Sequence, residues 1–297
     1  YIMQKTMKTS GAETLCCAAN IFVGQTEAPL LIKPYIETLT QSELYAVMTG
    51  GFATIAGGVM AAYISFGIPP EHILAASVMS APAALAVSKV LYPETEPAKT
   101  GESVQVATVS DSGNGIDALA SGAHQGMMLA LNVGAMLIAF LALLAFVNAI
   151  FAGIGAQIGV PDLSLEWLLS YILAPVAWLM GVPAPDCAQV GVLLGKKTIF
   201  NEFIAYLDLK TLIENSEKVT TGELSRDAVP VISERGKIIA TYALCGFANF
   251  GSIGIQIGGI GGIAPQRQGD VARLGIQTML AGTVACFMTA CVAGMLL

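Results

Sequence analysis

Two glutamates of this 297-residue chain lie inside long apolar stretches. Glu27 belongs to the run Gly-Gln-Thr-Glu-Ala-Pro at 24–29, and Glu202 lies between Asn201 and Phe203. An ionisable side chain in a membrane segment is costly to bury, so such a residue is a candidate functional site. Two such sites in corresponding halves of a chain are typical of membrane proteins that carry a substrate.

Three consecutive polar side chains form the first cluster. Gln25, Thr26 and Glu27 provide an amide, a hydroxyl and a carboxylate. These groups suit a neutral ligand that is rich in hydroxyl and amide-like edges, because a buried carboxylate accepts charge-assisted hydrogen bonds from such donors. The alternative is that the three residues only cap the half-helix that follows them.

Glu202 and its neighbour Asn201 form the second cluster. Two carboxylates on opposing hairpins can hold the hydroxyls of a ribose, or one of them can carry a proton. The alternative is an ion pair between Glu202 and Lys196 or Lys197.

A third cluster follows near the end of the chain, where Phe247, Asn249 and Ser252 offer a ring, an amide and a hydroxyl. Asn249 and Ser252 are three residues apart and share one face of a helix. Together with the ring they suit a stacked base. The alternative is that they only join two helices through polar contacts.

Oxygen ligands also gather where the helical pattern is interrupted. The Asn20 side chain, the Thr54 hydroxyl and the carbonyls near Val23 and Ile55 are hard donors that can hold a sodium ion.

The composition identifies the kind of protein that carries these clusters. The chain is 55% hydrophobic and 12% charged, whereas soluble domains carry about 25% charged residues. Residues 118–161 contain no formal charge and exceed the ~20 residues that a helix needs to cross hydrocarbon. We therefore predict an all-α polytopic membrane protein. The net charge of −7 argues against nucleic-acid polymers as partners.

The pattern predicts one order of elements twice, namely a re-entrant hairpin, a broken span and a span. The first set is 11–40 with its tip at 24–29, 42–66 with a weak point at 49–58, and 71–91. A polar connection at 92–118, a long spanning helix at 126–155 and an interfacial or buried segment at 163–181 follow. The second set is 186–213, 238–262 interrupted at 248–252, and 274–297, with an aqueous insertion at 214–237.

This internal repeat is typical of secondary transporters. The inner ends of half-helices leave free backbone groups, which only a buried polar cavity tolerates. Their N-terminal ends suit ligand oxygens and their carbonyl ends suit a cation. Because the chain opens on Tyr1 and ends on an apolar run, we expect it to be the C-terminal part of a longer protein.

Three motifs resemble those of concentrative nucleoside transporters. Residues 195–206 read Gly-Lys-Lys-Thr-Ile-Phe-Asn-Glu-Phe-Ile-Ala-Tyr, similar to the family signature Gly-x-Lys-x-x-x-Asn-Glu-Phe-x-Ala-Tyr. Residues 20–30 resemble the tip of the family's first hairpin, and residues 247–254 resemble its second broken helix. The similarity covers the whole chain.

The resemblance implies a homotrimer in which each protomer has a scaffold domain and a transport domain that moves like an elevator. It divides the chain into a first transport-domain repeat at 1–91, a polar connection at 92–125, a scaffold helix with an interfacial helix at 126–185, and a second transport-domain repeat at 186–297.

The resemblance also implies roles for the polar residues. The nucleobase would contact Gln25, Thr26 and Glu27. The ribose hydroxyls would contact Glu202, Asn249 and Ser252, and Phe247 would line the pocket. Sodium would be bound by Asn20, Val23, Thr54 and Ile55, with Thr54 where the family has Ser. The presence of Asn20 makes the chain similar to the sodium-driven branch.

We therefore expect a sodium-coupled importer of nucleosides such as uridine, embedded in the lipid of a plasma membrane (the inner membrane in a bacterium). Sodium is the co-transported ion, no organic cofactor is expected, and the protein is not an enzyme. Two alternatives remain open: proton coupling through Glu27 or Glu202, and a membrane-embedded enzyme that uses the two carboxylates as acid and base.

Overall fold

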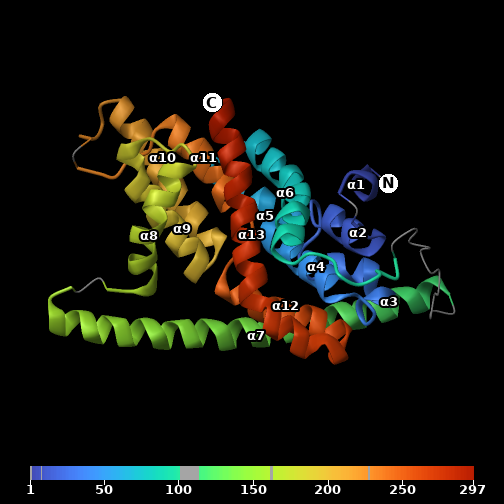
Figure 1. Cartoon of the computed structure of the whole chain (residues 1–297). Coiled ribbons are helices and arrows are strands. Elements are labelled where there is room, and N and C mark those ends of the chain that lie inside the picture. Colours follow the sequence, from blue (N-terminus) through green and yellow to red (C-terminus); the bar gives the residue numbers. More distant parts are fainter. Residues whose placement is uncertain (1, 8, 101–113, 161–162, 227) are drawn as a thin grey trace.

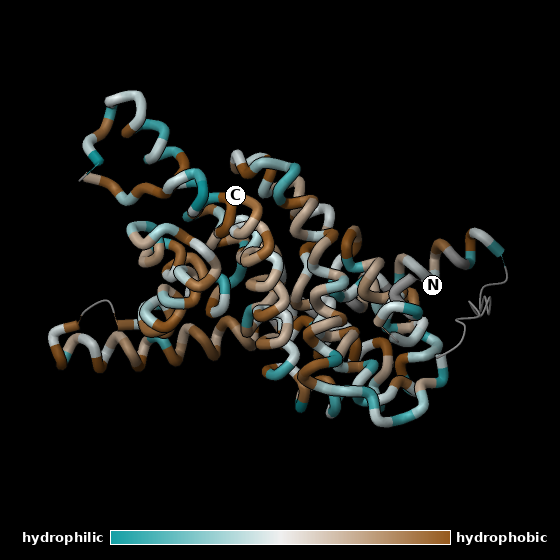
Figure 2. The backbone as a smooth tube through the Cα atoms, turned by 45° about the horizontal axis from the view of Figure 1, so that its top comes forward, coloured by the Kyte–Doolittle hydropathy of each residue, from teal (hydrophilic) through white to brown (hydrophobic). Residues whose placement is uncertain are grey.

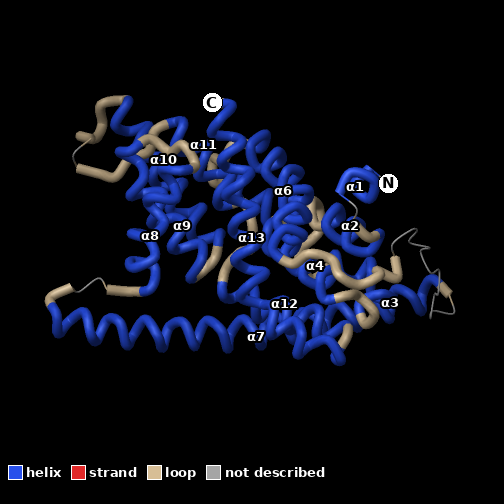
Figure 3. The backbone as a smooth tube through the Cα atoms, in the orientation of Figure 1, coloured by secondary structure: helices blue, strands red, loops and turns tan. Residues whose placement is uncertain are grey.

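The computed structural model describes residues 2–7, 9–100, 114–160, 163–226 and 228–297. Within these ranges every regular element is helical (Figure 3). Among the described residues, four helical segments are long and apolar enough to cross a membrane: Gln41–Ser65, Pro70–Leu91, Gly115–Ile158 and Pro265–Leu296. The predicted all-α polytopic fold is thus confirmed.

The first re-entrant hairpin follows the short helix α1 (Ile2–Met7). Helix α2 (Gly11–Ala19) enters the hairpin, turns at 20–27 form its tip, and η1 (Ala28–Ile32) with α3 (Lys33–Ile36) leave it. Pro29 lies in the first turn of η1, where a residue without an N–H is tolerated. We call this segment hairpin one.

The first broken span consists of α4 (Gln41–Ala53) and α5 (Gly57–Ser65). The break at 54–56 falls inside the predicted weak point, and Thr54 has an extended backbone with φ −117° and ψ 168°. Helix α6 (Pro70–Leu91) follows after a turn in which Gly67 adopts a φ of 88°, a conformation that glycine adopts readily.

Helix α7 (Gly115–Ile158) is longer than the predicted 126–155. It begins at Gly115 because the Asn114 side chain accepts hydrogen bonds from the N–H groups of Ile116 and Asp117. The predicted polar connection therefore ends earlier than expected, and its residues 101–113 lie outside the described ranges. The 44 residues of α7 extend for ~66 Å. In Figure 1, α7 crosses beneath the other helices at a large angle.

The second set of elements repeats the first. Helix α8 (Leu165–Leu179) packs along α9 (Cys187–Ile199), and α10 (Glu202–Thr220) leaves the tip of this second hairpin. We call α9 and α10 with the turn between them hairpin two. The second broken span is α11 (Glu234–Leu244) and α12 (Phe250–Ile263), and α13 (Gln268–Leu296) is the last span. The short turns η2 (Ala184–Asp186) and η3 (Pro265–Arg267) precede α9 and α13.

Helix α13 lies at the centre of this arrangement. It contacts α4, α6, α11 and α12, and Figure 1 shows it between hairpin one with α4–α6 on one side and α8–α10 on the other. Small residues allow close approach here; a methyl group on Gly282 would lie 2.4 Å from the Phe52 side chain. The hydropathy colouring of Figure 2 shows that much of the long helix α7 consists of hydrophobic residues, and few of its described residues are buried.

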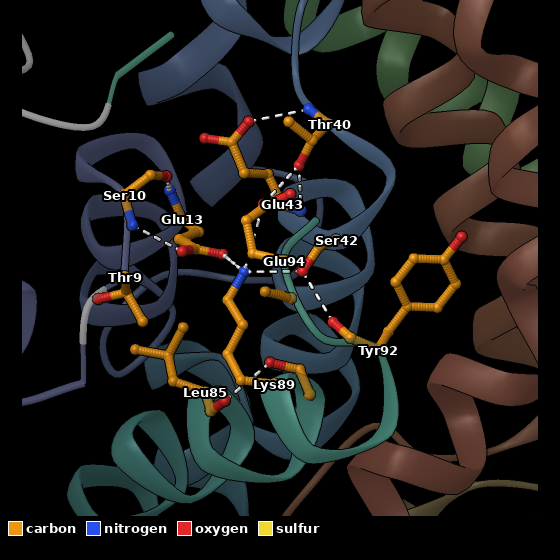
Figure 4. Close-up of polar contacts among 12 residues, drawn as sticks. Thr9, Ser10, Glu13, Thr40, Ser42, Glu43, Leu85, Lys89, Tyr92 and Glu94 are labelled. Carbon is orange, nitrogen blue, oxygen red and sulfur yellow. Dashed lines mark hydrogen bonds and ion pairs between the residues drawn. The ribbon is translucent and has the colours of Figure 1, made fainter. Parts of the chain in front are cut away.

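Two polar anchors hold the base of hairpin one. At the α2 anchor, Glu13 and Glu43 each complete a capping box at the start of α2 and α4. Lys89, near the end of α6, lies 2.7 Å from Glu13 and donates to the Ser42 hydroxyl at 2.9 Å (Figure 4). Thr100 donates to Glu43, and its carbonyl accepts from the N–H of Gly11.

At the α3 anchor, the buried guanidinium of Arg267 donates to three backbone carbonyls at and just after the end of α3: Ile36 at 3.2 Å, Glu37 at 3.3 Å and Leu39 at 2.7 Å. These carbonyls lie at the C-terminal end of a helix, where a cationic side chain is stabilising. Both arms of hairpin one are therefore fixed at the base to other elements.

Candidate functional site

A cavity of about 270 Å³ lies where the two hairpin tips meet the breaks in the two broken spans. It is lined by residues 24–27, Ala56, residues 200–202, Phe247, Asn249, Ser252 and Ile255. The set includes all seven predicted substrate residues. A larger cavity of about 580 Å³ lies between α10 and the segment before α11, but it contains none of the predicted site residues.

Glu202 is the first residue of α10 and is 4% exposed. Asn201 caps this helix by accepting a hydrogen bond from the N–H of Ile204 at 3.0 Å, which places the carboxylate at the positive end of the helix dipole. Its Oε1 accepts from the Tyr63 hydroxyl at 3.0 Å, and its Oε2 accepts from Asn249 Nδ2 at 3.1 Å. An ionised carboxylate has about four acceptor positions, so capacity remains for ligand hydroxyls.

The alternative partners of Glu202 bind elsewhere. Lys196 forms an ion pair with Asp208, and Lys197 donates to the carbonyl of Ala243 at 2.9 Å. Neither lysine forms an ion pair with Glu202 in the described structure, so that alternative is wrong. The carboxylate is held by neutral donors, and its charge remains available to a ligand.

Asn249 is the N-cap residue of α12. Its Oδ1 accepts from the N–H of Ser252 at 2.8 Å. Because a backbone N–H can only donate, the amide nitrogen of Asn249 must point the other way, toward Glu202. The backbone thus fixes which end of this amide enters the site.

The tip of hairpin one reaches the same place. Gln25 Nε2 donates to the Ser252 hydroxyl at 3.2 Å, and the Thr26 hydroxyl donates to Glu27 Oε2 at 3.0 Å. Glu27 lies at the N-cap position of η1, yet its side chain makes no capping bond. The capping alternative is therefore wrong, and Glu27 lines the cavity as an exposed carboxylate.

Phe247 lies in the break between α11 and α12 and lines the cavity. Its N–H donates to the carbonyl of Thr54 at 3.1 Å, so the breaks of the two broken spans are joined directly. The close approach depends on Gly246, because a methyl group there would lie 2.8 Å from the Phe52 carbonyl.

The predicted sodium ligands belong to the tip of hairpin one and to the break between α4 and α5. The fully buried Asn20 Oδ1 accepts no hydrogen bond from any residue that the structure describes, which is costly unless a cation or water is bound. The Thr54 hydroxyl donates to the carbonyl of Gly50 at 2.9 Å and keeps its acceptor positions. A hydrogen bond of 3.0 Å from Gly57 N–H to the Phe22 carbonyl places the segments of Val23 and Ile55 beside each other. This set of neutral oxygen donors fits a hard cation.

Two residues of the site were missed by the sequence analysis. Tyr63 is fully buried, and its ring stacks on Tyr206 with 4.2 Å between the ring centroids. Gln256 is 1% exposed and donates to Gln25 Oε1 at 3.1 Å. Its signal was available, because an amide in an apolar span is unusual and Gln256 follows Ser252 by one helical turn.

Comparisons with known proteins agree with this geometry. Residues 72–294 match a family described as "Na+ dependent nucleoside transporter C-terminus", and residues 1–70 match one described as "Nucleoside recognition". Solute carrier family 28 member 3 of Eptatretus stoutii is 51% identical over 298 residues, which cover 100% of this chain and 43% of that protein. Sodium/nucleoside cotransporter 1 of Sus scrofa is 48% identical and is covered to 46%. The chain thus spans less than half the length of these relatives.

Solved structures of CNTnw are similar as well. A substrate-bound, inward-facing form is 44% identical, with a TM-score of 0.77, covering 99% of this chain and 66% of that one. A variant in an outward-facing state is 43% identical, with a TM-score of 0.86 and coverages of 99% and 68%.

Proposed function

The chain belongs to the Na+-dependent nucleoside transporter family, and from this membership we propose that it binds a nucleoside between its two hairpin tips and carries it across a membrane together with sodium. The membership places the chain among transporters, so the enzyme alternative drawn from the two carboxylates is set aside.

The observation that carries the proposal is the hydrogen-bonded row of Tyr63, Glu202, Asn249, Ser252 and Gln25 along one cavity. Glu202 is an anionic acceptor, and hydrogen bonds from hydroxyls to it are stronger than those to neutral groups. A ribose offers such hydroxyls. Gln25 lies at the other end of the row and offers an amide to a nucleobase, while Phe247 offers a ring.

Coupling to sodium follows from the position of the ion's ligands. Asn20 and Val23 belong to hairpin one, as do Gln25, Thr26 and Glu27. A sodium ion bound by Asn20, Val23, Thr54 and Ile55 would order the tip that presents the three nucleobase residues. Such a coupling is reciprocal, because a nucleoside that orders the tip must raise the affinity for sodium by the same factor.

The motion proposed for this cycle is an elevator in which residues 1–91 and 186–297 move past the scaffold helix α7. The support is that CNTnw has been solved in an inward-facing and in an outward-facing state. The TM-score of this chain is higher for the outward-facing structure, 0.86, than for the inward-facing one, 0.77. Helix α7 carries exposed apolar side chains such as Leu131, Ile138 and Phe146. Such a surface suits contact with lipid and with the other subunits of a homotrimer. The membrane would be a plasma membrane, which is the inner membrane in a bacterium.

The test is uptake of radiolabelled uridine by proteoliposomes that contain the protein at its full natural length. Accumulation with an inward sodium gradient, and none with an equal potassium gradient, is expected. Uptake that ignores sodium and follows a pH gradient would transfer the coupling to Glu27 or Glu202. No saturable uptake under either gradient would remove the nucleoside as substrate.

A further inference from the structure

The amide of Gln256 connects three elements behind the cavity. Gln256 lies in α12 and is 1% exposed. Its nitrogen donates two hydrogen bonds, one to the backbone carbonyl of Met48 in α4 at 3.0 Å and one to Gln25 Oε1 at 3.1 Å. Gln25 in turn donates from its own nitrogen to the Ser252 hydroxyl at 3.2 Å.

The direction of this chain of hydrogen bonds is set by its first member. The carbonyl of Met48 can only accept, so the amide nitrogen of Gln256 must face it. The same nitrogen donates to Gln25, which turns the oxygen of Gln25 away from the cavity and its nitrogen toward Ser252. The hydroxyl of Ser252 could not set this direction, because a hydroxyl donates and accepts equally well.

The two amides and the neighbouring Thr26 pack closely against glycines of α4 and α12. A methyl group on Gly51 would lie 2.8 Å from Gln256 Nε2 and 3.0 Å from the Cβ of Gln25. A methyl group on Gly259 would lie 2.8 Å from Thr26 Cγ2. The tip of hairpin one therefore packs against α4 and α12 at two glycines, where no side chain separates it from the helix backbone, and Gln256 lies between the tip and α4.

We propose that Gln256 is a positioning residue that holds Gln25 as a hydrogen-bond donor toward the nucleobase. An amide nitrogen carries two N–H groups; one is used by Ser252, and the second serves the ligand. The site then selects bases that present an acceptor to Gln25, a carbonyl oxygen or an unprotonated ring nitrogen. This inference rests on the proposed nucleoside transport.

The experiment measures how well base analogues compete with radiolabelled uridine in proteoliposomes that contain the protein at its full natural length. The probes are uridine, the pyrimidin-2-one riboside, which lacks O4, and the pyrimidin-4-one riboside, which lacks O2. The variant Gln25→Ala identifies which analogue reports on the Gln25 amide. In the unaltered protein, the inhibition constant of that analogue should be about threefold to tenfold higher than that of uridine, because one neutral hydrogen bond is lost. The quotient of the two constants is the base-analogue ratio.

Two variants on different helices test Gln256 itself. Gln256→Met removes the donor, and Gly51→Ala adds a methyl group on α4 that crowds both the nitrogen of Gln256 and the Cβ of Gln25. Each is expected to bring the ratio close to one, as Gln25→Ala does, because the Gln25 amide is then free to turn over. The control is Gly58→Ala, whose added methyl group meets no atom within 4 Å, and it should keep the ratio of the unaltered protein.

A second ratio, uridine against 2′-deoxyuridine, reports on the ribose contacts and should stay unchanged in Gln256→Met. The proposal is overturned if a variant that transports uridine, Gln256→Met or Gly51→Ala, keeps the base-analogue ratio of the unaltered protein. It is also overturned if the base-analogue ratio and the 2′-deoxyuridine ratio fall by the same factor. A Gln25→Ala variant that keeps every base ratio would overturn it as well. Absence of uridine uptake by the unaltered protein is a different result and removes the proposed function itself.

Discussion

The hydroxyl of Tyr63 donates a hydrogen bond of 3.0 Å to Oε1 of Glu202, across 139 residues of sequence. Tyr63 belongs to the broken span of the first repeat, and Glu202 belongs to the hairpin of the second. One repeat therefore presents the carboxylate and the other orients it. The ring of Tyr63 is fixed in turn by stacking on Tyr206.

Replacement of Tyr63 by Phe should weaken uridine binding while the protein still folds, because the ring stays and only the hydroxyl is lost. A hydrogen bond to a charged group predicts a rise in KM of about tenfold or more. The measurement is the concentration dependence of uptake. Tyr171→Phe, at an exposed position of α8, is the control, and an unchanged KM in Tyr63→Phe would contradict an orienting role.

Replacement of Glu202 by Gln should abolish uptake while the protein still inserts into the membrane. Tyr63 and Asn249 both donate to the carboxylate, and an amide has a single acceptor oxygen, so one of them would face an N–H and the ribose would lose its acceptor. Uptake in vesicles is compared with the amount of inserted protein. Saturable uridine uptake at the unaltered level would remove Glu202 from the site.

Changes at Asn20 and Thr54 should alter the dependence on sodium more than the dependence on uridine at saturating sodium. Asn20→Ala removes a buried oxygen that accepts no hydrogen bond, and Thr54→Val removes the hydroxyl while keeping the shape. Both should raise the sodium concentration that gives half-maximal uptake. Thr54→Ser keeps the hydroxyl and should behave as the unaltered protein does. If Thr54→Val has an unchanged sodium dependence, its hydroxyl is not a ligand.

Loss of Lys89 should destabilise the protein through the α2 anchor. Glu13 is 1% exposed and Lys89 is 18% exposed, so Lys89→Met would leave a buried carboxylate without its cation, at a cost of roughly 3 kcal/mol. A lower thermal unfolding midpoint in detergent is expected. The double variant Lys89→Met with Glu13→Gln should recover part of the loss, and equal midpoints for the single and double variants would show that the pair does not couple.

The sequence alone was sufficient to select those candidate site residues that interrupt apolar spans. Glu27, Glu202 and Asn249 each stand beside a break, where half-helix ends meet, and the structure brings them to one cavity. Their roles toward base and ribose stay predictions, as do the sodium site, the division into transport and scaffold domains and the homotrimer.

Tyr63 and Gln256 could not be assigned in the same way. A buried tyrosine in an apolar helix usually belongs to the core, and only the crossing of the two repeats brings its hydroxyl to Glu202. Gln256 is marked in the sequence as an amide in an apolar span, but its role depends on a carbonyl of α4 that is 208 residues away. Local pattern does not contain such contacts. The start of α7 is different, because the Asn114 cap acts two and three residues along the chain and is a local signal for a helix start.

The two anchors of hairpin one have a consequence for biosynthesis. The α2 anchor requires Lys89 and Thr100, and the α3 anchor requires Arg267. Hairpin one precedes Arg267 by more than two hundred residues along the chain, so during synthesis the hairpin is made long before the contact that holds its second arm exists. Changes near Arg267 should therefore reduce yield through failed assembly of a segment that was translated more than two hundred residues earlier.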